Sequence, residues 1–145
     1  ILVTAGGTQE SIDPVRYIGN RSSGKMGYAI AEQAARMGAK VILVSAPTSL
    51  PIPSGVDFIS VDSAVSMQEA VEARYNDVNV VIMAAAVSDF RVLHKAEQKI
   101  KKMEYMTIEL CRCVFYCFSC FISIISLAIL CSSSFEIFLL TSISM

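Results

Sequence analysis

The chain begins with ILVTAGG, at residues 1–7, and this segment is the strongest indication of its fold. Its first five residues are apolar or β-branched, and two glycines end the run. A short run of this kind, followed at once by a turn signal, is typical of a strand buried on both faces of a sheet. Such strands occur almost only in parallel sheets that helices cover, so the opening of the chain predicts an α/β domain.

Helical patterns follow this strand twice. The first predicted helix is capped by Ser22 or Ser23 and runs to about Met37, with Gly38 as its stop. Apolar side chains recur along it at helical spacing, at Met26, Ile30, Ala34 and Met37. The second predicted helix is capped by Asp62 or Ser63 and ends near Tyr75.

Apolar runs at residues 40–45, 58–61 and 79–86 predict three more strands, while residues 6–23 are expected to form a long loop. Strands separated by helices indicate a parallel sheet with right-handed crossovers. We therefore predict an α/β fold, a Rossmann-like, three-layer parallel sheet. Ligands bind beyond the carboxyl ends of such strands, which places residues 6–23 and 84–91 on one rim.

The composition changes sharply after Leu110. All five cysteines lie beyond it, and residues 111–145 contain no Gly, Pro, Lys or Asp. We expect residues 1–110 to be the N-terminal part of a domain that is incomplete in its C-terminal half. We expect residues 111–145 to be an unrelated apolar tail, which is either non-native or, if native, disordered or helical. The chain also starts at Ile1 inside an apolar run, so we expect it to be a fragment at this end as well.

The charge balance excludes one class of partner. With 12 basic and 13 acidic residues, the net charge is −1. No long-range field then favours nucleic acid, so any anion must be held by local groups.

A candidate phosphate site precedes the first predicted helix. Residues 19–25, GNRSSGK, have the spacing of a phosphate loop, but Met26 stands where that loop needs Ser or Thr. A glycine-containing turn that leads into a helix N-terminus still suits a phosphate. Its donors are expected to come from Ser22, Ser23, Gly24 and Lys25. The alternative is a well-capped helix that binds nothing.

Two further segments carry candidate residues. Arg16 places a guanidinium in the same loop, suited to a carboxylate or phosphate, although a lone Arg is more often part of a structural ion pair. Residues 83–88 are mostly small and would let a ligand approach the backbone, and Asp89 follows them. An Asp in that place is also a common turn former. Neither the single His94 nor the irregular cysteine spacing indicates a metal site.

Taken together, these segments resemble a known family. GGT at residues 6–8, IDPVRYI at 12–18, NRSSGKMG at 20–27, residues 83–91 and KIKK at 99–102 stand in its order and spacing. The family is the phosphopantothenoylcysteine synthetase domain of the bacterial bifunctional pantothenate-metabolism flavoproteins. The resemblance covers about the first 102 residues.

The resemblance implies a two-step ligation in coenzyme A biosynthesis. The carboxylate of 4′-phosphopantothenate attacks the α-phosphate of CTP, brought with Mg²⁺, and cysteine then captures the acyl-cytidylate. By motif position, Asn20, Arg16 and Lys99 would be catalytic, with Asn20 and Arg16 orienting the carboxylate. The nucleotide pocket would be lined by Met83, Ala84, Ala85, Asp89 and Lys99.

Further expectations come with that resemblance. The complete domain would be a cytoplasmic homodimer, with Lys99 in a mobile flap near the site. The flavin-binding domain that often precedes the synthetase is missing, so no FMN site is expected here. We expect the truncated chain alone to be inactive; the alternatives are a nucleotide-binding remnant without catalysis or, if residues 113–135 span a bilayer, a tail-anchored membrane protein.

Overall fold

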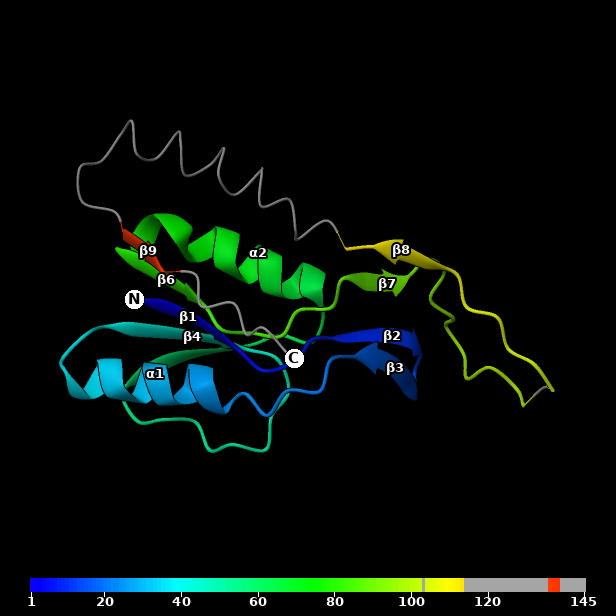
Figure 1. Ribbon diagram of the computed structural model, residues 1–145, viewed down its shortest axis with the longest axis horizontal. Coiled ribbons are helices and arrows are strands. Elements are labelled where there is room, and N and C mark those ends of the chain that lie inside the picture. The colour runs from blue at the N-terminus through cyan, green and yellow to red at the C-terminus, as the bar shows by residue number, and fades with distance from the viewer. Residues whose placement is uncertain (103, 114–135, 139–145) are drawn as a thin grey trace.

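The computed structural model describes residues 1–102, 104–113 and 136–138. A five-stranded sheet in the order β5-β4-β1-β6-β9 forms its centre (Figure 1). All neighbouring strands in it are parallel. Its strands are β1 Leu2–Ala5, β4 Val41–Ser45, β5 Val56–Ser60, β6 Val80–Met83 and β9 Glu136–Phe138. The opening run is thus the middle strand, and every residue of β1 is buried, as predicted.

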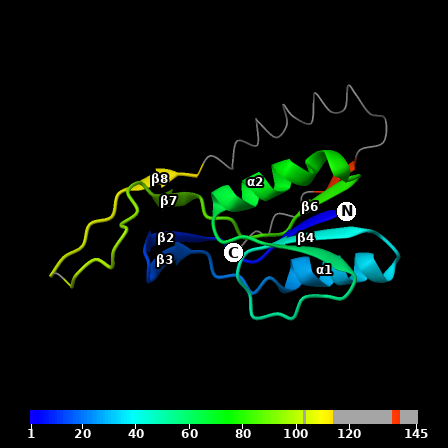
Figure 2. The ribbon, with the colours of Figure 1, turned by 180° about the vertical axis from the view of Figure 1, so that it is seen from behind.

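Two helices cover opposite faces of the sheet, α1 (Lys25–Arg36) and α2 (Ala64–Arg74), as Figures 1 and 2 show. Successive residues of β1 point to opposite faces. Leu2 therefore packs in the cluster that contains Met67 of α2, whereas Val3 packs in the cluster that contains Ala31 of α1. The three-layer, Rossmann-like parallel sheet is confirmed. A single 3-10 turn, η1 (Tyr75–Asp77), follows α2.

The start of α1 differs from the prediction. The residue before the helix is Gly24, with φ of 73°, and no side chain caps the helix. Ser22 or Ser23 as N-cap was therefore wrong, because glycine alone reaches this left-handed conformation without strain. Instead, the Ser22 hydroxyl oxygen accepts a hydrogen bond from the Gly24 N–H at 3.3 Å. Ser63 does cap α2, in a capping box with Ser66.

The inward face of α1 agrees only in part with the prediction, since Ile30 and Ala34 pack against the core but Met26 and Met37 do not. Its buried residues are Gly27, Tyr28 and Ala31, whereas Met26 is 41% and Met37 78% exposed. A Cβ added to Gly27 would lie 2.6 Å from the Cβ of Ala5. The helix thus packs closely on β1 through a residue without a side chain, which an apolar pattern cannot reveal.

The expected loop at residues 6–23 contains an antiparallel hairpin, β2 (Gln9–Asp13) and β3 (Arg16–Gly19). The loop prediction was wrong because the apolar pattern of this hairpin is too sparse to read from sequence. The hairpin is fixed to the start of α2, where the Ala64 N–H donates to the buried Glu10 carboxylate at 2.8 Å.

The last predicted strand is shorter than expected, since β6 ends at Met83. A second antiparallel pair follows, β7 (Phe90–Val92) with β8 (Leu110–Arg112). Both antiparallel pairs lie beyond the same end of the parallel sheet, and the chain between β7 and β8 extends away from it (Figure 1).

One part of the predicted tail joins the sheet. Residues of β9 pair with β6, with Val80 opposite Glu136. Most of the stretch proposed as a bilayer span, residues 114–135, lies outside the described residues. Among the residues that are described, no helix has the length and apolar character to cross a membrane. The division into residues 1–110 and 111–145 stays a prediction.

Candidate functional site

The site lies at the carboxyl edge of the sheet, where the segments that follow β1 and β6 meet. The Ala86 N–H donates to the Gly6 carbonyl at 2.8 Å, and the Thr8 N–H donates to the Ala86 carbonyl at 3.2 Å. These two bonds form a parallel bridge between segments about 80 residues apart. The predicted shared rim of residues 6–23 and 84–91 is therefore present.

Two threonine hydroxyls fix the backbone after β6. The Thr4 hydroxyl oxygen accepts from the N–H groups of Ala84 at 3.1 Å and Ala85 at 3.2 Å. The Thr8 hydroxyl oxygen accepts from the Ser88 N–H at 2.9 Å. Both threonines are fully buried. Their hydroxyl oxygens therefore fix the backbone of residues 84–88 against β1 and the segment that follows it. The sequence analysis gave neither threonine a structural role. Their positions, within the first strand and just after it, were the signal for such a role.

The N-terminus of α1 meets the same edge. A Cβ on Gly24 would lie 3.3 Å from the Gly6 nitrogen, so the start of the helix and the end of β1 are in close contact. The first turn leaves the N–H groups of Lys25 and Met26 without intrahelical acceptors. Ser22, Ser23 and Lys25 around this turn are exposed. The predicted donors are thus brought together at an accessible helix N-terminus, whose dipole favours an anion.

Asn20 connects this turn to the segment after β6. Its side-chain amide donates to the Val87 carbonyl at 3.0 Å. Gly7 packs against it, because a Cβ there would lie 2.7 Å from the Asn20 carbonyl oxygen. The predicted nucleotide residues follow along the rim: Met83, Ala84 and Ala85 are partly buried, and Asp89 is exposed.

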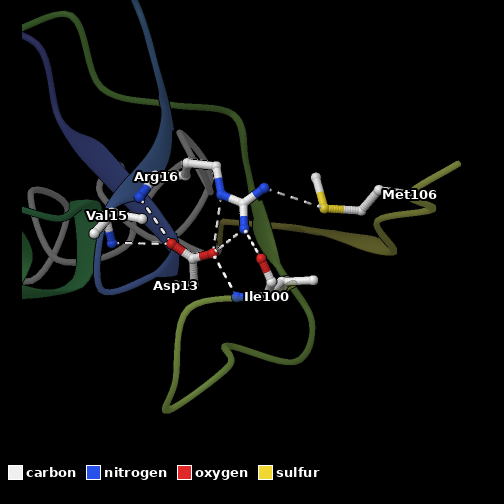
Figure 3. Close-up of polar contacts among 5 residues, drawn as sticks. All are labelled: Asp13, Val15, Arg16, Ile100 and Met106. Carbon is white, nitrogen blue, oxygen red and sulfur yellow. Dashed lines mark hydrogen bonds and ion pairs between the residues drawn. The ribbon is translucent and has the colours of Figure 1, made fainter. Parts of the chain in front are cut away.

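Arg16 is engaged in a structural ion pair, the alternative that the sequence left open. Its guanidinium donates to the carboxylate of Asp13 through Nε at 2.9 Å and also through Nη2. Nη2 donates to the Ile100 carbonyl at 2.9 Å as well, and Nη1 contacts Met106 Sδ at 3.8 Å (Figure 3). The side chain keeps 38% of its surface exposed.

Asp13 is the residue that the sequence reasoning overlooked. Burial raises the pKa of its carboxyl group, but hydrogen bonds from Arg16 and from three backbone N–H groups hold that pKa well below its usual range. The carboxylate is therefore charged throughout the neutral range. Its signal in the sequence was the Asp-Pro turn with an Arg three positions later.

Lys99 is exposed beside Ile100 and forms no hydrogen bond or ion pair with any described residue. The ion pair of Asp13 and Arg16 holds the segment of Lys99 against the hairpin, whereas the Asn20 side chain, from the turn before α1, contacts the segment after β6 at Val87. No group of three metal-binding side chains occurs in residues 1–102, 104–113 and 136–138.

Comparison with known proteins places this rim in a family. The family model of the DNA/pantothenate metabolism flavoprotein C-terminal domain matches residues 1–114. Coenzyme A biosynthesis bifunctional protein CoaBC of Vibrio vulnificus is 57% identical over 104 residues, which are 72% of this chain and 26% of that protein. The chain thus spans about a quarter of the length of this curated relative.

Solved structures agree. The C-terminal domain of a CoaBC protein superposes with a TM-score of 0.68 at 51% identity, covering 78% of this chain and 53% of that one. A Cab2 mutant solved in complex with phosphopantothenate-cysteine has a TM-score of 0.59 at 19% identity, covering 76% of this chain and 56% of that one, a likeness of fold alone. The family match, the sequence identity and the shared fold show that the chain matches the synthetase portion of the bifunctional proteins. The chain therefore belongs to the DNA/pantothenate metabolism flavoprotein C-terminal domain family.

Proposed function

We propose that this chain carries the phosphate and nucleotide half of a CTP-dependent phosphopantothenate–cysteine ligase in coenzyme A biosynthesis. The carboxylate of 4′-phosphopantothenate attacks the α-phosphate of CTP and pyrophosphate leaves. The amine of cysteine then attacks the acyl-cytidylate, and CMP leaves. The observation that carries the proposal is the convergence of the α1 N-terminus with the backbone of residues 84–88 at one edge of the sheet.

The residue types at this edge suit the charges of the reactants. Triphosphate, phosphopantothenate and the developing pyrophosphate are all anions, so the site needs donors and positive charge. The exposed first turn of α1 offers N–H groups, the Ser23 hydroxyl and the Lys25 ammonium group. Lys99 supplies a second ammonium group from the segment after β7.

The small side chains of Ala84 and Ala85 suit a nucleotide that lies against the backbone. Thr4 fixes the N–H groups of both residues, so this wall of the pocket is rigid before ligand binds. Met83 and Asp89 lie at the two ends of this wall, and Asp89 has the exposed carboxylate. In this proposal they contact the base and ribose.

Asn20 and Arg16 act on the carboxylate that is activated. One N–H of the Asn20 amide is used by Val87, which fixes the side chain and leaves its oxygen and second N–H for the substrate. Among the described residues, the one acceptor of the Arg16 Nη1 group is the weak sulfur acceptor of Met106, so a substrate carboxylate can replace that contact.

The metal is part of the substrate in this proposal. Mg²⁺ arrives with CTP and keeps phosphate oxygens and waters as ligands, as is usual for Mg²⁺ bound to nucleoside triphosphates. In this proposal the reaction takes place in the cytoplasm and involves only small molecules. The complete domain is a homodimer, and this chain by itself is inactive.

Product formation in a completed domain tests the proposal. Residues 1–104 of this chain would replace the matching segment of the Vibrio vulnificus relative, and release of the nucleoside monophosphate would be followed, CMP with CTP and AMP with ATP. We expect CMP only when 4′-phosphopantothenate and cysteine are both present, and loss of turnover in K99A but not in K40A. A folded chimera that forms no CMP contradicts the proposal.

A further inference from the structure

Residues 93–102 are fastened to the β2–β3 hairpin mainly at one residue, Ile100. The Ile100 N–H donates to Asp13 Oδ2 at 3.2 Å, and the Ile100 carbonyl accepts from Arg16 Nη2 at 2.9 Å (Figure 3). One more backbone bond, from the Ala96 N–H to the Ile12 carbonyl at 2.9 Å, connects the same two segments. Both polar groups of the Ile100 backbone are thus held by an ion pair of the hairpin.

The two oxygens of the Asp13 carboxylate have separate partners. Oδ1 accepts from the N–H groups of Val15 and Arg16, each at 2.9 Å, and so closes the turn of the hairpin. Oδ2 accepts from the Arg16 guanidinium and from Ile100. Asp13 is 2% exposed, so water does not compete for these bonds, and hydrogen bonds to a charged group are the strong ones.

We propose that Asp13 is a positioning residue that, together with Arg16, fixes the backbone at Ile100 and so sets the position of Lys99. Adjacent Cα atoms are about 3.8 Å apart, so the place of Ile100 determines the place of its neighbour. The importance of Lys99 rests on the proposed function, but the attachment of its segment does not. Asp13 contacts no substrate in this account and acts only through the segment it holds.

The variant D13N separates the two roles of the carboxylate. The amide oxygen of Asn can still accept from Val15 and Arg16, so the turn is kept, whereas the amide nitrogen cannot accept from Ile100 or the guanidinium. The matched control is E32Q, which removes the exposed ion pair of Glu32 with Arg36 on α1, at 2.6 Å.

The first measurement is cleavage of the whole chain by a lysine-specific protease, with cleavage after Lys40 as internal reference. For D13N we expect cleavage after Lys99 and its neighbouring lysines to be about tenfold faster. The reason is that the segment loses the strong hydrogen bond from the Ile100 N–H to the charged carboxylate, so it opens locally more often. E32Q should match the wild type. Unchanged cleavage after Lys99 in D13N, or equal acceleration at Lys40, overturns the proposal.

The second measurement is the dissociation constant for CTP with Mg²⁺ of D13N, K99A and the double variant. If Asp13 acts through Lys99, D13N weakens binding, and adding D13N to K99A weakens it no further. Additive losses contradict a positioning role. A wild-type chain that does not bind CTP contradicts the proposed function, while the cleavage result still decides whether Asp13 holds the segment.

Discussion

The side-chain amide of Asn20 donates a hydrogen bond to the backbone carbonyl of Val87 at 3.0 Å. Asn20 follows β3 of the hairpin, whereas Val87 follows β6 of the parallel sheet, 67 positions later. The bond joins the turn before α1 to the rim after β6, so the phosphate donors and the proposed nucleotide wall form one site. The acceptor at Val87 is a carbonyl oxygen, so only a side chain with a hydrogen-bond donor can form this bond.

The first prediction concerns the variant N20D in the completed domain. A carboxylate at this position cannot donate to Val87 and would repel the substrate carboxylate, so turnover should fall by at least about a hundredfold. The triphosphate donors on α1 remain, so the CTP dissociation constant should change much less than turnover. Steady-state kinetics and calorimetric titration give the two quantities, and equal losses in both contradict the assigned role.

The second prediction concerns the support of the nucleotide wall, in the variant T4V. Valine has nearly the same shape but no oxygen, so the N–H groups of Ala84 and Ala85 lose their acceptor. The free energy of unfolding should fall by about 1–3 kcal/mol, measured by urea titration. The control T107V removes the hydroxyl of an exposed residue that forms no hydrogen bond with any described residue, and it should leave the free energy of unfolding nearly unchanged. A T4V variant as stable as the wild type contradicts the role of Thr4.

The third prediction concerns the close packing of α1 on β1, in the variant G27A. Alanine is normally the better helix residue by about 1 kcal/mol, but here the new methyl group would lie 2.6 Å from the Ala5 Cβ and 2.8 Å from the Thr4 carbonyl oxygen. We expect a net loss of about 1–3 kcal/mol in the free energy of unfolding, from overpacking.

The matched control for G27A is A29G on the exposed side of the same helix. There the ordinary preference should hold, and glycine should cost about 1 kcal/mol. Stabilisation by G27A would show that the helix does not approach the strand this closely.

The fourth prediction is a pH dependence that comes from Asp13. Its folded pKa is lowered, so its contribution to stability is fully present above the unfolded carboxyl pKa of about 3.9 and is lost as the pH falls towards the lower folded value. The free energy of unfolding of the wild type should therefore fall more steeply than that of D13N below about pH 4. Urea unfolding at a series of pH values gives both slopes, and identical slopes rule out this contribution.

The order of the two long helices and of strands β1, β4, β5 and β6 was accessible from sequence because each signal was local. The run at residues 1–5, the stop at Gly38 and the cap at Ser63 all occupy the places that their residue types predict. The shared rim followed from the rule that parallel strands end at the same edge. These features need no knowledge of distant contacts.

The parts that sequence reasoning missed depend on contacts between distant segments. The Gly27 face of α1 is set by close approach to Ala5, and the role of Thr4 by N–H groups 80 positions away. Likewise, the role of Asp13 depends on Ile100, whose backbone N–H donates to its second carboxylate oxygen. Local patterns contain no information on such pairs.

Binding of CTP with Mg²⁺ to the chain itself, followed by calorimetry, tests the central claim most directly. The account predicts saturable binding that K25Q weakens about tenfold, the scale of one charge-assisted phosphate contact. The control K40Q, at the exposed residue just before β4, should leave binding unchanged. Absence of binding by a folded chain, or equal effects of K25Q and K40Q, would contradict the claim that the α1 N-terminus and the segment after β6 form a nucleotide site.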